Sequence, residues 1–227
     1  MDEIFHWRVA DTRIPSEFSP VLVEAGVVGG FAIRQPGVEV AVERHEALDR
    51  LRPVHLELQK ELGLQDHRLC LAEQVHGTGI AHAAQCADEW FPAADALITA
   101  DPSVCLGIYV ADCCAVYLVD IERRAIGLVH SGAKGTRLGI VPKTVDKMGD
   151  AFGTRPESVV VVLSPCIRPP FYEVDFAAEI RTQCKEIGIQ RVVDSGVCTG
   201  AGMDRYYSYR REQGKTGRML ALLALSV

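Results

Sequence analysis

Short apolar segments separated by turns constrain the fold of this chain more than any other feature of its sequence. After Gly63 the sequence consists largely of β-branched and aliphatic runs, which are typical of strands. The expected strands are Arg68–Ala72, Gly79–Ala83, Val104–Val110, Ala115–Val119, Ala125–Val129 and Ser158–Leu163. The tetrapeptide Asp120-Ile121-Glu122-Arg123 provides a hairpin-like turn between two of them.

Helical segments are fewer and do not alternate regularly with the strands. Leucines near a 3.6-residue spacing predict a helix over Arg44–Leu64, which Pro53 is expected to divide or to restart. Two further helices are expected at Thr136–Phe152 and Asp175–Ile187, followed by Gly153 and Gly188. The C-terminal part is expected to form strands at Tyr206–Arg211 and Gly217–Leu225, joined by a turn at residues 212–215. This order favours an α+β fold over a doubly wound parallel sheet.

Composition then excludes several classes of protein. The 227 residues are 48% hydrophobic and 24% charged, and no repeat or linker divides them, so we expect a single folded domain over residues 1–227. A net charge of −6 argues against a nucleic-acid partner. No apolar run reaches the roughly 20 residues of a membrane helix, so no membrane association is expected. The N-terminus lacks the pattern of a secretory signal, so we expect a cytoplasmic protein whose eight cysteines are thiols.

Three possible metal ligands lie at the ends of separate predicted strands. His76, Cys113 and His130 offer two imidazoles and a thiolate, which zinc binds well, and three protein ligands leave a fourth position for water or substrate. Cys114 is expected to point away from Cys113, because adjacent side chains of an extended chain face opposite ways. The alternative is that each of these residues has an ordinary structural role at a strand end.

Two basic segments could bind an anion. Gly132-Ala133-Lys134-Gly135-Thr136 joins a predicted strand to a predicted helix, where free backbone N–H groups and the Lys134 charge suit phosphate. Residues 204–218 are rich in arginine and tyrosine, and strand alternation would place Ser208 and Arg210 on one face. The alternatives are a tight turn with a solvated lysine and a charged hairpin in water.

Taken in order, the motifs resemble those of a known family. They are Gln74-Val75-His76-Gly77, Ala94-Asp95-Ala96-Leu97-Ile98-Thr99, Ala111-Asp112-Cys113, Val129-His130-Ser131-Gly132, Ser164-Pro165-Cys166-Ile167, Phe171-Tyr172-Glu173-Val174, Cys198-Thr199, Ser208-Tyr209-Arg210-Arg211 and Thr216-Gly217-Arg218. Over about residues 68–223 the chain resembles the laccase-domain family, also called polyphenol oxidases or purine nucleoside phosphorylases of the YfiH type.

This resemblance implies a fold, a metal and an activity. The fold is a four-layer αββα sandwich with mixed sheets, and the metal is zinc held by His76, Cys113 and His130. The activity is phosphorolysis of adenosine and inosine, with adenosine deamination and methylthioadenosine cleavage as side activities. The implied partners are therefore a purine nucleoside and phosphate, whereas the sequence does not fix the oligomeric state.

The chain also departs from the family pattern. Ala133-Lys134 stands where the family usually has Trp-Arg, and a lysine does not reproduce the forked hydrogen bonding of an arginine. Ser164 replaces a glycine of the family's G-P-[CA] motif, and residues 32–37 only faintly echo its Thr-Arg-x-Gly-Gly segment. The chain between Val174 and Cys198 is shorter than the family pattern. The ligand set is intact while the pocket around it is altered.

We assign roles on this basis. Asp112 is expected to orient a ligand histidine or to act in acid–base chemistry, and Gln74, Lys134, Ser208 and Arg210 are expected to bind substrate or phosphate.

Rival hypotheses share the same scaffold. They are a peptidoglycan-precursor editing amidase, a metal-free thiol hydrolase that uses Cys113 and His130, a copper-dependent phenol oxidase, and a binding protein without turnover. The oxidase is disfavoured because the sequence does not supply the ligands of a multicopper cluster.

Overall fold

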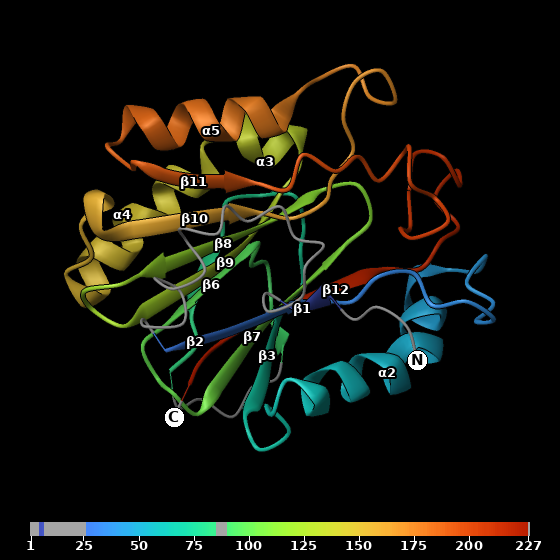
Figure 1. Cartoon of the computed structure of the whole chain (residues 1–227), viewed down its shortest axis with the longest axis horizontal. Coiled ribbons are helices and arrows are strands. Elements are labelled where there is room, and N and C mark those ends of the chain that lie inside the picture. Colours follow the sequence, from blue (N-terminus) through green and yellow to red (C-terminus); the bar gives the residue numbers. More distant parts are fainter. Residues whose placement is uncertain (1–4, 7–25, 85–89, 227) are drawn as a thin grey trace.

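Two six-stranded sheets packed face to face form the centre of the molecule (Figure 1). The computed structural model describes residues 5–6, 26–84 and 90–226. Across the first sheet the strands are β1 (Phe5–His6), β2 (Val27–Phe31), β12 (Met219–Leu225), β7 (Val104–Val110), β3 (Arg68–Ala72) and β5 (Trp90–Phe91). Across the second they are β11 (Arg191–Asp194), β10 (Val159–Leu163), β8 (Cys114–Asp120), β9 (Ala125–Ser131), β6 (Ala96–Thr99) and β4 (Ile80–His82). Both sheets are mixed, since parallel pairs such as β3–β7 and β10–β11 lie beside antiparallel pairs such as β7–β12 and β8–β9.

Alternating side chains of the central strands supply separate apolar layers. In β7, Leu106 and Ile108 belong to the core between the sheets, whereas Cys105 belongs to the layer on the outer face. In β8, Tyr117 lies in the core between the sheets and Leu118 lies under the helices of the second sheet. Strands covered on both faces have continuous apolar sequences, which explains why these segments were recognisable.

Helices cover the outer face of each sheet (Figure 1). They are α2 (Arg44–Glu61), α3 (Ala133–Arg137), α4 (Ile140–Phe152) and α5 (Phe176–Glu186), with a 3-10 turn at Pro156–Ser158. Leu58 of α2 shares a buried cluster with Leu222 of the first sheet, and Met148 of α4 and Ile180 of α5 pack on the second. The predicted α+β fold with αββα layers is confirmed. No helix in the described ranges is long and apolar enough to cross a membrane.

Two helix predictions were wrong in detail. The helix expected over Thr136–Phe152 is two helices, because Leu138 ends α3 and Gly139 begins α4 with a φ of 70°. Glycine adopts this left-handed conformation without steric cost. Pro53 does not divide its helix but lies inside α2. Pro53 and Asp49, whose carbonyl loses its backbone donor, are both exposed, so water can replace the missing N–H.

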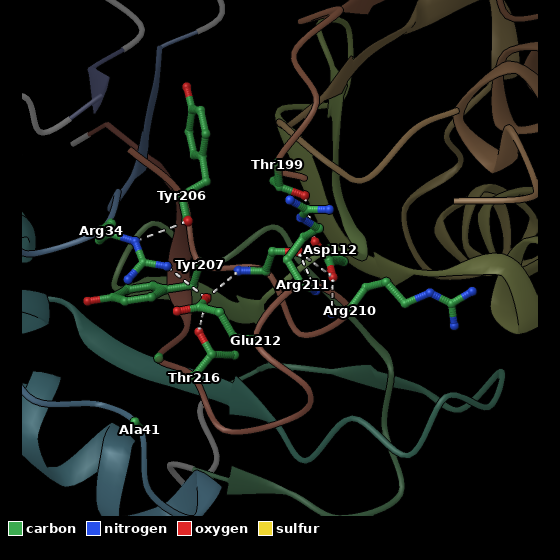
Figure 2. Close-up of polar contacts among 12 residues, drawn as sticks. Arg34, Ala41, Asp112, Thr199, Tyr206, Tyr207, Arg210, Arg211, Glu212 and Thr216 are labelled. Atoms are coloured by element: carbon green, nitrogen blue, oxygen red, sulfur yellow. Dashed lines mark hydrogen bonds and ion pairs between the residues drawn. The ribbon is translucent and has the colours of Figure 1, made fainter. Parts of the chain in front are cut away.

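Residues 206–211, predicted as a strand, form turns instead. The segment folds around one carboxylate oxygen, Oε2 of Glu212 (Figure 2). It accepts hydrogen bonds from the guanidinium of Arg34 (2.7 Å), the hydroxyl of Thr216 (2.6 Å) and the amide of Ser208 (3.0 Å). A backbone that turns back on one side chain cannot extend beside a neighbouring strand, so the period-two argument does not apply here.

The charge of Glu212 predicts a pH-dependent contribution to stability. Burial alone would raise the pKa of Glu212, but hydrogen bonds from Arg34, Thr216 and Ser208 lower it below its ordinary value of 4.5. The resulting stabilisation is present above the unfolded-state pKa and is lost as pH falls through the lower folded-state pKa. We therefore expect Glu212→Gln to reduce the free energy of unfolding by about 1–2 kcal/mol at neutral pH and by much less near about pH 3.

Urea unfolding at both pH values measures this difference, with Glu57→Gln at an exposed position of α2 as the control. An equal loss for Glu212→Gln at both pH values would contradict a role for the charge.

Candidate metal site

The loop after β3 carries His76 and is held by a neighbouring amide side chain. The amide of Gln74 donates to the carbonyl of Tyr109 and accepts from its N–H (3.0 Å), so it continues the pairing of β3 with β7. Gln74 and His76 have left-handed φ angles of 66° and 58°. Non-glycine residues persist in this region only where surrounding contacts fix them. Both polar atoms of the Gln74 amide are thus hydrogen-bonded to the backbone of Tyr109. Binding of substrate by Gln74 stays a prediction.

Asp95 supplies most of the contacts that fix this loop. It lies directly before β6 and is fully buried. Its Oδ1 accepts a hydrogen bond from the amide of His76 (2.9 Å), and its Oδ2 accepts from those of Gly77 (2.7 Å) and Val75 (3.2 Å). Oδ1 also lies 2.9 Å from Nδ1 of His130.

Asp95 also sets which nitrogen of His130 is free. Burial alone would raise the pKa of Asp95, but hydrogen bonds from His130, Gly77 and His76 lower it. The carboxylate is therefore an acceptor, so Nδ1–H of His130 is the donor, and Nε2 is the nitrogen that could bind a metal once its proton is lost. A carboxylate behind a histidine in this way fixes the ring for metal binding.

Cys113 lies in the short connection between β7 and β8. Its Sγ packs against Gly132, where an added Cβ would lie only 2.5 Å from the sulfur. Cys114, the next residue, is fully buried and its Sγ lies 3.8 Å from the carbonyl of Ser164. The adjacent cysteines thus point in different directions, and only Cys113 faces the histidines.

His76, Cys113 and His130 converge at one point. The distance from Sγ of Cys113 to Nε2 of His76 is 3.9 Å, and the two imidazole rings are 4.7 Å apart. One ligand atom from each residue lies within 4.8 Å of the other two, and this is the only such group of three in the described ranges. That separation is about twice a zinc–ligand distance, so small side-chain rotations suffice for one ion. The three residues could hold a metal and leave a fourth position open.

Charges within the site stabilise a thiolate. Burial alone would raise the pKa of the Cys113 thiol, but the charge of His130 and hydrogen bonds from both histidines lower it to about 6. Burial alone would lower the pKa of His130, but Cys113 and Asp95 raise it to about 9. A thiolate is the form of cysteine that binds metal or attacks an electrophile.

Asp112 anchors the C-terminal loop beside the site (Figure 2). Its carboxylate accepts hydrogen bonds from the hydroxyls of Thr199 (2.7 Å) and Ser208 (3.0 Å) and from the amide of Arg210 (2.7 Å). The expectation that it orients a ligand histidine was wrong, because the carboxylate on His130 is that of Asp95. Acid–base chemistry by Asp112 and substrate binding by Ser208 stay predictions.

The two basic residues proposed for phosphate lie at exposed positions. Lys134 is in α3, which has only five residues. The guanidinium of Arg210 forms an ion pair with Glu173 and lies 5.3 Å from the ring centre of Tyr172. Contact of either residue with an anion stays a prediction.

Asp95 is a functional residue that the sequence did not reveal. The motif Ala94-Asp95-Ala96 is part of the family resemblance, but its local sequence indicates no chemistry. A carboxylate between two alanines, directly before an apolar run, was the available signal, because a buried charge must be fully hydrogen-bonded.

We expect Asp95→Asn to weaken zinc binding by about 10–100-fold, as the loss of a hydrogen-bond partner of a ligand typically does. The amide cannot accept on both atoms, so the loop at His76 and the ring of His130 lose their common anchor. Competition with a chromophoric chelator measures the affinity. Asp101→Asn is the matched control, because Asp101 also accepts a backbone N–H, that of Ser103, on the surface. Equal affinities of Asp95→Asn and the control would contradict this role.

Gly132→Ala provides a second test of the site. The φ of Gly132 is −101°, so alanine fits the backbone, but its methyl group would overlap Sγ of Cys113. We expect the thiol to rotate away and zinc binding to weaken at least about tenfold, with unfolding little changed. Gly135→Ala serves as the control, because Gly135 lies in α3 without a left-handed φ and an added Cβ there makes only ordinary contacts of 3.5 Å or more. Unchanged zinc affinity in Gly132→Ala would show that the packing on Gly132 does not position the sulfur.

Comparisons with known proteins agree with this geometry. A profile of the family described as "Multi-copper polyphenol oxidoreductase laccase" matches residues 37–179 and 172–226. A Deinococcus radiodurans protein named purine nucleoside phosphorylase is 35% identical over 204 residues, which cover 78% of this chain and 79% of its own. A Streptomyces coelicolor protein of the same name is 29% identical over 187 residues, which cover 70% and 76%.

Solved structures are similar in fold. YlmD from Geobacillus stearothermophilus superposes with a TM-score of 0.74 at 24% identity, over 89% of this chain and 93% of its own. A Neisseria meningitidis protein superposes with a TM-score of 0.76 at 25% identity, over 89% and 96%. With a profile match over most of its length, a relative at 35% identity and a shared fold, this chain belongs to the laccase-like family so described.

Proposed function

We propose that this protein is a zinc-dependent purine nucleoside phosphorylase that converts adenosine or inosine and phosphate into the free base and ribose 1-phosphate. The observation that carries the proposal is the convergence of His76, Cys113 and His130, with Asp95 behind His130. Relatives named purine nucleoside phosphorylase support the choice of substrate class. Adenosine deamination and methylthioadenosine cleavage belong to the same proposal as side activities.

The donor set suits zinc. Two imidazole nitrogens and one thiolate are common zinc ligands, and a site with three protein ligands keeps one position for reacting molecules. When bound there, zinc supplies a Lewis acid that polarises an oxygen. His76, Cys113 and His130 would hold it, and Asp95 would keep Nδ1 of His130 protonated, so that Nε2 would be the nitrogen that loses its proton to the metal.

The reaction needs two reactants beside each other. A phosphate oxygen forms a bond to C1′ of the ribose as the C1′–N9 bond breaks, and the electron pair of that bond leaves with the purine, which takes up a proton. The loop at residues 206–217, held by Asp112 and Glu212, and the loop at residues 74–77, held by Asp95, border the ligands. Fixed loops reduce the entropy lost when the two reactants are aligned.

One observation favours a second candidate, a thiol hydrolase. The pKa of Cys113 is lowered to about 6 beside His130, which is the arrangement of an activated cysteine nucleophile. A thiol hydrolase should survive a chelator and lose activity to iodoacetamide, whereas the zinc enzyme should do the reverse.

The decisive experiment combines metal analysis with turnover. We expect about one zinc per chain, release of base from adenosine or inosine only when phosphate is present, and loss of turnover on dialysis against a chelator. Base release that does not need phosphate would contradict phosphorolysis. Retention of full activity without metal would instead favour the thiol hydrolase.

A pair of cysteine variants tests the ligand assignment. We expect Cys113→Ala to abolish zinc binding and turnover, because it removes one of three ligands. Cys114→Ala should leave the zinc content unchanged, because that thiol lies in the core under the helices. Equal loss of zinc in both variants would show that the ligand has been misassigned.

A further inference from the structure

A second polar cluster lies on the outer face of the first sheet, around Tyr109. The ring of Tyr109 lies 5.3 Å from that of His55 of α2 and 6.1 Å from that of Trp90, with an interplanar angle of 23° to the indole. Trp90 is 45% exposed, so one side of this aromatic group is open to solvent. Burial raises the pKa of Tyr109 to about 12, although the charges of Arg52 and Arg44 oppose the rise. Its hydroxyl therefore stays a neutral hydrogen-bond donor.

Three guanidinium groups belong to this cluster. Arg44 and Arg52 lie on α2, and Arg218 directly precedes β12, whose first two residues pair with Val110 and Tyr109. Arg44 and Arg218 are close enough to affect each other: burial and then the charge of Arg44 lower the pKa of Arg218. We call Arg44, Arg52 and Arg218 the arginine cluster.

No guanidinium of the arginine cluster forms an ion pair with a carboxylate in the described part of the chain, and Asp112 acts on Arg218 only from beyond ion-pair distance. Arg44 donates to the carbonyl of Glu73 (3.2 Å), and Arg218 donates to the carbonyls of Thr216 (2.8 Å) and Gly217 (2.9 Å). By contrast, Arg50 on the same helix forms an ion pair with Glu46 (2.6 Å). Like charges gathered without a paired carboxylate repel each other and attract an anion.

A buried acceptor without a partner lies against the same cluster. Burial lowers the pKa of His55 to about 4, although a hydrogen bond to the backbone of Arg218 opposes the change. The ring is therefore neutral, with one N–H donor and one bare nitrogen. Its Nδ1 is buried and has no hydrogen-bond partner among the described residues. Such an unsatisfied group is costly unless a ligand or water completes it.

The arginine cluster is near the candidate metal site. Arg218 follows the loop that Asp112 and Glu212 hold, and the charges of Cys113 and Asp112 act on it. The ladder pairing of Met219 with Val110 places Arg218 next to the connection that carries Cys113. An anion bound there would lie beside the metal site, on the side of α2.

We propose that the arginine cluster, with Tyr109 and His55, is an oxyanion site that binds inorganic phosphate. Guanidinium groups bind phosphate oxygens through charge-assisted hydrogen bonds, and the hydroxyl of hydrogenphosphate could donate to Nδ1 of His55. The inference rests on the proposed function and extends it, because it names the residues that bind phosphate, the second substrate. It is an alternative to the sequence-based expectation that Lys134 binds phosphate.

Calorimetric titration of inorganic phosphate into the purified protein at constant ionic strength tests the site. We expect Arg44→Gln and Arg218→Gln each to weaken binding about tenfold or more, because each removes a charged donor. Arg44 is exposed, so it carries the test if Arg218→Gln fails to fold by circular dichroism. Arg50→Gln, which breaks the ion pair with Glu46 on the same helix, is the matched control and should stay within about twofold.

The outcomes separate this inference from the proposed function. If Lys134→Ala weakens phosphate binding and the arginine variants do not, the inference is overturned. Lys134 would then be the residue that binds phosphate. Phosphorolysis with an unchanged KM for phosphate in Arg44→Gln and Arg218→Gln would also overturn it, while the proposed function would stand. Phosphate binding that depends on the arginines, in a protein without nucleoside turnover, would support the site and contradict the proposed function.

Discussion

The buried carboxylate of Asp95 is the interaction on which the candidate site depends. It accepts hydrogen bonds from the backbone N–H groups of residues 75–77 and from Nδ1–H of His130. One side chain therefore positions both His76 and His130, two of the three candidate ligands. A charge with no solvent exposure is tolerated because both of its oxygens are fully hydrogen-bonded. The left-handed conformation of His76 follows from this anchor, because the amides must turn toward one point to reach it. Removing the charge would release the loop and the histidine ring together.

The four-layer fold explains why the ligands meet. β3 and β7 belong to the first sheet, whereas β4 and β8, which follow them in the chain, belong to the second. His76 and Cys113 therefore lie in connections that cross from one sheet to the other, and His130 lies near the end of β9 beside them. Crossing connections contain irregular backbone, which explains the left-handed φ angles of Gln74, His76 and Asp112. The sheets themselves remain regular and provide rigid support for the site.

Much of the fold, and the convergence of three residues that could bind a metal, could be predicted from the sequence, for identifiable reasons. Strands β3 and β7 match their predicted bounds because their sequences are largely apolar and most of their residues are buried. The ligands are the residue types that zinc binds, so their chemistry was visible without a structure.

The predictions from the sequence fail where polar contacts between distant residues determine the backbone conformation. Residues 206–211 have the composition of a strand, yet Asp112 and Glu212 fold them into turns. Nothing local in the sequence shows that Asp95, rather than Asp112, is the partner of His130, because the two strands that bring Asp95 there pair only in the folded sheet.

The donor chemistry also bears on how the family description applies to this chain. A multicopper centre needs enough histidines and cysteines close together to bind several ions, and the described residues bring one group of three donors to one point. Three donors with an open fourth position suit a single ion that acts on a bound oxygen. The surroundings agree with this use, because the arginine cluster, which forms no ion pair with a carboxylate in the described ranges, lies on one side and loops fixed by Asp95 and Asp112 lie on the other. The proposed phosphorolysis must align an anion with a neutral sugar and needs such positive charge, whereas oxidation of a phenol does not, so the charge distribution supports that proposal.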